Sequence, residues 1–118
     1  YPSPTAVTLL SFTANVVGES VLLEWETASE VDNLGFNLYR EDLQSGLKLR
    51  INPNLIPSKI PGGSEGDMYD FVDNDVIFGE PYAYWLEALD LRMRIKDQYG
   101  PVVTLWWQFF LPLFSVGP

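Results

Sequence analysis

Cysteine and histidine are both absent from this chain of 118 residues. Their absence excludes zinc fingers, thiol nucleophiles, Ser-His-Asp triads, and haem or iron–sulfur ligation by the usual side chains. Most familiar catalytic apparatus is excluded with them. We therefore expect no enzyme activity, no cofactor and no resident metal.

Basic residues are also scarce, because 7 Lys and Arg stand against 16 Asp and Glu, for a formal net charge of -9. Proteins bind nucleic acids and anionic lipid surfaces largely through Lys and Arg. The longest apolar run, residues 105–114, is interrupted by Gln108 and Pro112 and is far shorter than the roughly 20 residues that span a bilayer. We expect neither a nucleic-acid partner nor a membrane span.

Hydrophobic residues make up 47% of the chain and aromatic residues 14%, which is enough at this length for one domain with a core that needs no disulfide. The first residue is Tyr1 rather than Met. This start suggests either that a leader was removed or that a module was cut from a longer protein. We expect a processed secreted protein at the cell surface.

Alternation of apolar and polar residues with a period of two runs through most of the chain, and turn residues recur about every ten positions. The pattern predicts strands over residues 10–14, 21–26, 35–40, 47–51, 68–72 and 82–89. A last strand, bent or split, is expected from residues 92–96 and 102–105. Residues 52–66 hold three Pro and three Gly, so we expect a crossing at the edge of a sheet. The sequence therefore predicts an all-β antiparallel sandwich of about seven strands.

The inward positions of these strands define the predicted core, which should lie between two sheets. Its members are Leu23, Trp25, Phe36, Leu38, Tyr82, Tyr84, Leu86 and Ala88.

Four segments carry a resemblance to a known family. Residues 21–25 read Val-Leu-Leu-Glu-Trp, residues 35–40 read Gly-Phe-Asn-Leu-Tyr-Arg, residues 69–73 precede an acidic turn, and residues 79–88 read Gly-Glu-Pro-Tyr-Ala-Tyr-Trp-Leu-Glu-Ala. In this order they resemble a fibronectin type III domain over residues 6–104. The run 25–30 with Asp32, Asn33 and Gly35 resembles a version found in bacterial secreted and surface proteins. The resemblance implies a scaffold or adhesion role, a core position for Trp25, and a corner closed by Tyr82.

Three carboxylates, Asp70, Asp73 and Asp75, lie beside Asn74. Calcium prefers such oxygen-rich clusters, but this turn lacks the glycine spacing and terminal Glu of an EF-hand. Asp and Asn in turns commonly bond their own backbone. We expect a structural role and no functional metal here.

Two further pairs are candidates for chemistry or binding. Glu24 and Glu26 share one outward face, so they are a conceivable acid–base pair, but solvation or pairing with Arg40 or Lys48 across strands is the simpler expectation. Trp85 and Tyr39 point opposite to the core series. They are placed either to stack on sugar rings or, as we favour, to pack across the sheet or against another subunit.

The last segment, residues 105–118, is apolar on both faces of any strand it could form. We name it the apolar arm. It either folds over its own sandwich, adds as a strand to a neighbouring subunit, or serves as a sorting segment. We expect the neighbouring subunit, with an interface formed by Leu105, Trp106, Trp107, Phe109, Phe110, Leu111, Leu113 and Phe114.

The expected organisation is an N-terminal extension over residues 1–5, the sandwich over 6–104 and the apolar arm over 105–118. The functional hypothesis is a non-enzymatic extracellular subunit that polymerises into a cell-surface filament, pilus or surface layer. Its main partner is then another copy of itself, with surface glycans or other surface proteins as further partners. The alternative is an adhesive, carbohydrate-binding or spacer module of a larger secreted or surface protein.

Overall fold

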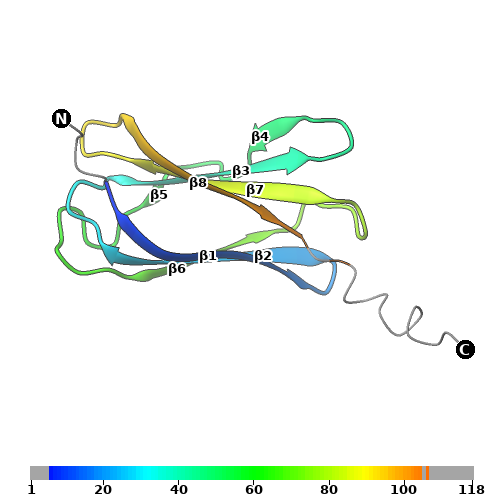
Figure 1. Cartoon of the computed structure of the whole chain (residues 1–118), viewed down its shortest axis with the longest axis horizontal. Coiled ribbons are helices and arrows are strands. Elements are labelled where there is room, and N and C mark those ends of the chain that lie inside the picture. Colours follow the sequence, from blue (N-terminus) through cyan, green and yellow to red (C-terminus); the bar gives the residue numbers. More distant parts are fainter. Residues whose placement is uncertain (1–5, 105, 107–118) are drawn as a thin grey trace, which may run out of the picture.

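Two antiparallel sheets pack face to face in the computed structural model, which describes residues 6–104 and 106 (Figure 1). One sheet has the strand order β1-β2-β6, and the other has the order β4-β3-β7-β8, with β5 paired to β3. The strands are β1 Thr8–Val17, β2 Ser20–Ser29, β3 Gly35–Asp42, β4 Lys48–Arg50, β5 Ile56–Pro57, β6 Met68–Asp73, β7 Tyr82–Leu89 and β8 Ile95–Val103. The predicted all-β antiparallel sandwich is confirmed.

One predicted strand segment is wrong. Residues 92–94 form the turn of the β7–β8 hairpin, and β8 begins only at Ile95. The reason is local, because the Asp90 carboxylate accepts hydrogen bonds from the backbone amides of Arg92 and Arg94, each at 2.9 Å. A residue so bonded closes a tight turn instead of continuing a ladder. Met93, inside this turn, has a φ of 63°.

The core lies between the two sheets, and all eight predicted core residues are at most 4% exposed. The Trp25 ring stacks on the Tyr69 ring with centroids 5.5 Å apart, and it meets the Phe36 ring edge-on at 5.5 Å. Gly35, next to Phe36, has no room for a Cβ because the backbone of Ile56 in β5 approaches it closely. This approach explains why glycine precedes the buried phenylalanine.

The chain enters and leaves the sandwich at opposite ends (Figure 1). The N-terminal pole contains the start of β1, the loop 30–34 and the β7–β8 hairpin tip, residues 90–94. The C-terminal pole contains the end of β8, the β3–β4 loop 43–47 and the β6–β7 loop 74–81. The register of β3 and β7 shows which loops share a pole. Gly35 pairs with Leu89 at the N-terminal pole, and Asp42 pairs with Tyr82 at the C-terminal pole.

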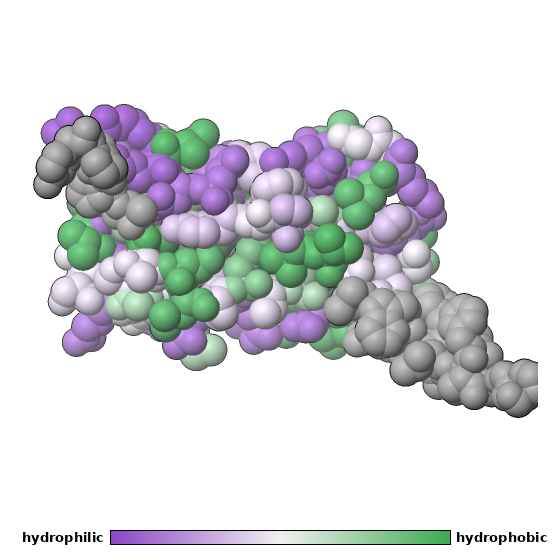
Figure 2. All heavy atoms as spheres, viewed as in Figure 1, coloured by the Kyte–Doolittle hydropathy of each residue, from purple (hydrophilic) through white to green (hydrophobic). Residues whose placement is uncertain are grey.

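The surface between the poles is mixed in character. Figure 2 is viewed from the side on which β1 and β8 lie in front, and it shows hydrophobic residues along the middle of that face. Hydrophilic residues dominate its upper left and upper right. Within residues 6–104 and 106 no helix is long and apolar enough to cross a membrane.

Candidate functional site

Exposed large apolar side chains are found at both poles of the sandwich. The C-terminal pole carries Leu43, Leu47, Leu49, Ile77 and Phe78, and the N-terminal pole carries Val31, Leu91, Met93 and Ile95. Exposed apolar groups of this size, rimmed by charge, are typical of surfaces that meet other proteins. The poles are therefore the candidate interaction surfaces.

An ion pair between the two sheets anchors the C-terminal pole. Arg40 of β3 donates from Nη1 to both carboxylate oxygens of Asp73 of β6, each at 3.0 Å. The Tyr84 hydroxyl of β7 donates to the same carboxylate at 2.8 Å. The Asp73 side chain is 3% exposed and that of Arg40 is 11% exposed. Burial, together with the nearby Asp73 charge, raises the pKa of Tyr84 well above its usual value.

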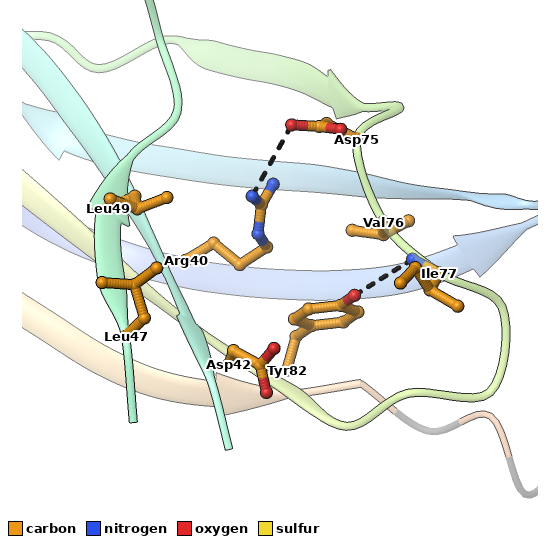
Figure 3. Close-up of a pocket in the computed structure, with 8 residues that line it drawn as sticks. All are labelled: Arg40, Asp42, Leu47, Leu49, Asp75, Val76, Ile77 and Tyr82. Carbon is orange, nitrogen blue, oxygen red and sulfur yellow. Dashed lines mark hydrogen bonds and ion pairs between the residues drawn. The ribbon is translucent and has the colours of Figure 1, made fainter. Parts of the chain in front are cut away.

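A pocket of about 250 Å³ opens beside this ion pair (Figure 3). Leu47 and Leu49 form one wall and Val76 and Ile77 the other, with Tyr82 between them. The pocket is also lined by Arg40, Asp42 and Asp75.

The Tyr82 ring is held in place from two sides. The Ile77 amide donates to the Tyr82 hydroxyl at 3.0 Å, which is the kind of corner contact that the family resemblance implied. The Arg40 guanidinium lies 5.6 Å from the Tyr82 ring centroid, within cation–π range. The Tyr82 ring, which lies between the two walls of the pocket, is thus fixed in position by these two contacts.

The three carboxylates of the predicted acidic cluster have separate roles. Asp73 is buried in the ion pair, whereas the Asp75 side chain is 98% exposed and lies 3.8 Å from Arg40. Asp70 is exposed on β6, opposite Glu24 of β2. Among the residues that the structure describes, no group of three or more carboxylates is placed to hold a metal ion.

Glu30 is the centre of a polar network at the N-terminal pole. Its fully buried carboxylate accepts hydrogen bonds from Thr27 at 2.7 Å, Asn33 at 3.1 Å and the Tyr69 hydroxyl at 2.8 Å, and from the Ser58 hydroxyl. These donors come from β2, from the loop that follows it, from the crossing between β5 and β6, and from β6 itself. The network fastens these segments together, which gives a physical reason for the motif of residues 25–35.

Burial is the main cause of the raised pKa of the Tyr69 hydroxyl in this network. It raises the Tyr69 pKa to about 12, and the adjacent Glu30 carboxylate acts in the same direction. The Tyr69 hydroxyl therefore stays protonated and remains a hydrogen-bond donor to Glu30 over the physiological pH range.

The outer face of the five-stranded sheet carries an aromatic pair. Tyr39 and Trp85 are cross-strand neighbours on β3 and β7, and both are half-buried, on the face opposite to the core. Lys48 of β4 lies over them, with Nζ 4.1 Å from the Trp85 ring centroid and 5.7 Å from that of Tyr39. The pair packs across the sheet under a lysine.

Of the two outcomes expected for Glu24 and Glu26, solvation or pairing with Arg40 or Lys48, the pairing is wrong. Both glutamates lie on β2 in the three-stranded sheet, whereas Arg40 and Lys48 lie on β3 and β4 in the other sheet. Strands of different sheets do not place side chains in cross-strand register. Sequence alternation identifies the outward face of a strand but does not identify its sheet.

The apolar arm is described at one position. Trp106 is 4% exposed, and its ring meets Phe78 of the β6–β7 loop edge-on, with centroids 4.8 Å apart. The arm therefore starts at the C-terminal pole, where Trp106, one of the predicted subunit-interface residues, packs into the core of its own sandwich beside Phe78. The other predicted interface residues, Leu105, Trp107, Phe109, Phe110, Leu111, Leu113 and Phe114, lie outside the described residues.

Sequence reasoning missed the β7–β8 hairpin as a surface feature. A signal was present, because three of the seven basic residues, Arg92, Arg94 and Lys96, fall within five positions of a strongly acidic chain. Because residues 92–96 were assigned to a strand, the hairpin tip at residues 90–94 was not recognised.

Comparison with known proteins identifies the fold. No family model matches the sequence, and no curated protein matches it significantly. The structure is similar to a solved Fn3-like protein from Clostridium thermocellum, with a TM-score of 0.61 and 15% identity over 86% of this chain and 94% of that chain. It is also similar to part of the pectate lyase Pel3 from Pectobacterium carotovorum, with a TM-score of 0.53 and 17% identity. The second match covers 87% of this chain and 27% of the lyase. The fibronectin type III-like fold predicted from the residues is confirmed.

Proposed function

We propose that this chain is a non-catalytic, extracellular structural module that assembles end to end into a cell-surface filament, pilus or surface layer. The observation that carries the proposal is the in-line path of the chain, which enters at one pole and leaves at the other with the apolar arm beginning there (Figure 1). Units of this form add length along one axis when they are joined at their poles. Joining the C-terminal pole of one copy to the N-terminal pole of the next is a head-to-tail contact. Such contacts build an open filament unless the rotation between successive copies closes a ring.

The buried charges support a structural role. Glu30 holds loops together through neutral donors, and Asp73 joins the sheets through Arg40. Both carboxylates are thus committed to the fold. The apolar arm supplies the attachment, because its aromatic residues bury area worth about 25 cal/mol per Å² when a neighbouring subunit covers them.

The test is the state of association of the full chain. Size-exclusion chromatography and negative-stain microscopy should show elongated assemblies. A variant with Trp107→Ser, Phe109→Ser and Phe110→Ser should elute as a monomer while its circular dichroism stays that of a β-sandwich. A wild-type chain that remains monomeric at every accessible concentration would contradict the proposal.

One observation favours a second candidate, a carbohydrate-binding or spacer module of a larger protein. Trp85 and Tyr39 form an aromatic pair near two cations, Lys48 and Arg50, and they donate hydrogen bonds to two carboxylates, Glu41 and Glu87. Aromatic rings stack on sugars, and cations suit acidic ones. One protein that contains this fold is a pectate lyase, and pectate is an acidic polysaccharide.

Affinity electrophoresis in gels that contain polygalacturonate separates the two candidates. A binding module should be retarded, and Trp85→Ala should abolish the retardation. A structural subunit should migrate unchanged in both forms, because Lys48 already occupies the face of the Trp85 ring.

A further inference from the structure

The β7–β8 hairpin at the N-terminal pole presents an apolar tip. Met93 is 65% exposed, and its neighbours Leu91 and Ile95 are 47% and 63% exposed. We name residues 91–95 the hairpin knob. Three exposed apolar side chains on one five-residue tip are costly to leave in water. The knob is therefore a candidate to enter a cavity on another molecule.

The knob is held in one conformation by Asp90. The Asp90 carboxylate accepts hydrogen bonds from the amides of Arg92 and Arg94 and from Nε of Arg94, all at 2.9 Å. Backbone bonds between Asp90 and Arg94 and between Met93 and Asp90 close the turn. These amides hold the pKa of Asp90 below its usual range. A tip organised in this way loses little conformational entropy on binding.

The opposite pole holds a cavity that suits this knob. The pocket of about 250 Å³ is open, and its walls Leu47, Leu49 and Ile77 are 57%, 45% and 67% exposed (Figure 3). A long unbranched side chain such as that of methionine adapts to a small apolar cavity.

The charges around the two features have opposite signs. The knob carries Arg92 and Arg94; Arg94 also contacts Asp90, and Asp32 accepts a hydrogen bond from the Leu91 amide at 3.2 Å, which leaves Arg92 as its unpaired cation among the contacts described. The rim of the pocket carries Asp42 and Asp75. Arg40 also lines the pocket and lies 3.8 Å from Asp75, but its single positive charge is shared with the buried Asp73, so the rim keeps a net negative charge.

We propose that the hairpin knob of one copy docks in the C-terminal-pole pocket of the next copy. Met93 enters between Leu47 and Ile77, and Arg92 and Arg94 face the acidic rim. The proposal rests on the proposed function in taking a second copy as the partner, but it uses no residue of the apolar arm. Because knob and pocket lie at opposite poles, the contact is head-to-tail and repeats along the long axis.

Contact area sets the expected strength. A knob of five residues in a small pocket buries far less than the roughly 1,200 Å² of a stable interface, so this contact alone is weak. Its role is to fix the register of neighbours that the apolar arm also joins.

Replacing Met93 with glycine tests the proposal without threatening the fold. Glycine adopts the φ of 63° at this position more readily than methionine does, so the turn should persist. In sedimentation velocity we expect the full-length Met93→Gly chain to associate at least tenfold more weakly than wild type. Ile77→Asp, which puts a charge into the pocket wall, should have the same effect. Leu10→Ala is the matched control, because Leu10 is 60% exposed on β1, and it should associate like wild type.

The outcomes separate this proposal from the previous one. Unchanged association of Met93→Gly overturns the knob contact, and it leaves the proposed function in place if the arm variant is monomeric. Equal weakening by Leu10→Ala also overturns it, because the effect would then follow from loss of any apolar surface. A monomeric wild type overturns both proposals.

Discussion

Glu30 and Asp73 are carboxylates buried at opposite poles of the same sandwich, and they are accommodated by different means. Neutral donors surround Glu30, and three of them are hydroxyl groups that can rotate. Asp73 is instead bound to a cation, Arg40, whose own side chain is 11% exposed. The N-terminal pole thus depends on an adaptable network and the C-terminal pole on a fixed ion pair. Changing Asp73 should therefore lower the free energy of unfolding more than changing Glu30 does.

The largest effect is expected from Asp73→Ala. This change leaves the Arg40 guanidinium nearly buried without its main partner, and breaking a buried pair in this way costs about 3–5 kcal/mol. Denaturant unfolding followed by tryptophan fluorescence measures the free energy of unfolding. The double variant Arg40→Met with Asp73→Leu should recover most of the loss, because it removes both charges. A loss below about 1 kcal/mol for Asp73→Ala would show that the pair does not stabilise this pole.

A smaller effect is expected from Glu30→Gln. The amide keeps one oxygen acceptor in the same volume, and the hydroxyls of Thr27, Ser58 and Tyr69 can turn toward it. We expect a cost of about 1–3 kcal/mol, the range for leaving one or two buried groups unsatisfied. The same denaturant titration, run beside the Asp73 variant, ranks the two poles. A greater loss of stability for Glu30→Gln than for Asp73→Ala would show that the hydroxyl network, and not the ion pair, is the less adaptable of the two.

The smallest effect concerns alkaline pH. Burial raises the pKa of Tyr69 to about 12, so the folded state keeps a proton that the unfolded state begins to lose near pH 10. The stability linked to Tyr69 is therefore fully present below about pH 10 and is lost as pH rises toward 12. We expect a loss of about 1 kcal/mol by pH 11 from this group.

Tyr69→Phe should remove that part of the alkaline decline. Tyr84, whose pKa burial also raises, supplies a second part at the other pole, so Tyr84→Phe serves as the matched variant. Thermal melts between pH 9 and pH 11 measure both slopes. Parallel slopes for Tyr69→Phe and wild type would contradict the assignment.

The fold was predictable because it follows from alternation alone. Trp25, Phe36 and Leu86 lie on inward positions that any half-buried strand must fill with apolar residues. The assignment of strands to sheets was not predictable in this way. For that reason the pairing of Glu24 and Glu26 with Arg40 or Lys48, one of the two outcomes expected for them, is wrong.

The candidate surfaces were harder to predict than the core. The role of Asp90 depends on hydrogen bonds to amides two and four residues ahead, which no periodicity marks. The pocket is assembled from Leu47 and Ile77, which are distant in sequence and meet only when β4 and the β6–β7 loop come together. The apolar arm was evident from composition, whereas the pocket exists only in the folded chain.

Disulfide trapping tests head-to-tail assembly most directly, because these 118 residues contain no cysteine. A chain with Met93→Cys and Ile77→Cys should, under mild oxidation, give a ladder of dimers, trimers and higher multimers on a non-reducing gel. Neither single variant should give more than traces of dimer, and the pair Leu10→Cys with Ile77→Cys should give no ladder. A Met93→Cys, Ile77→Cys chain that stays monomeric, or that is no better linked than the Leu10 pair, would contradict the account.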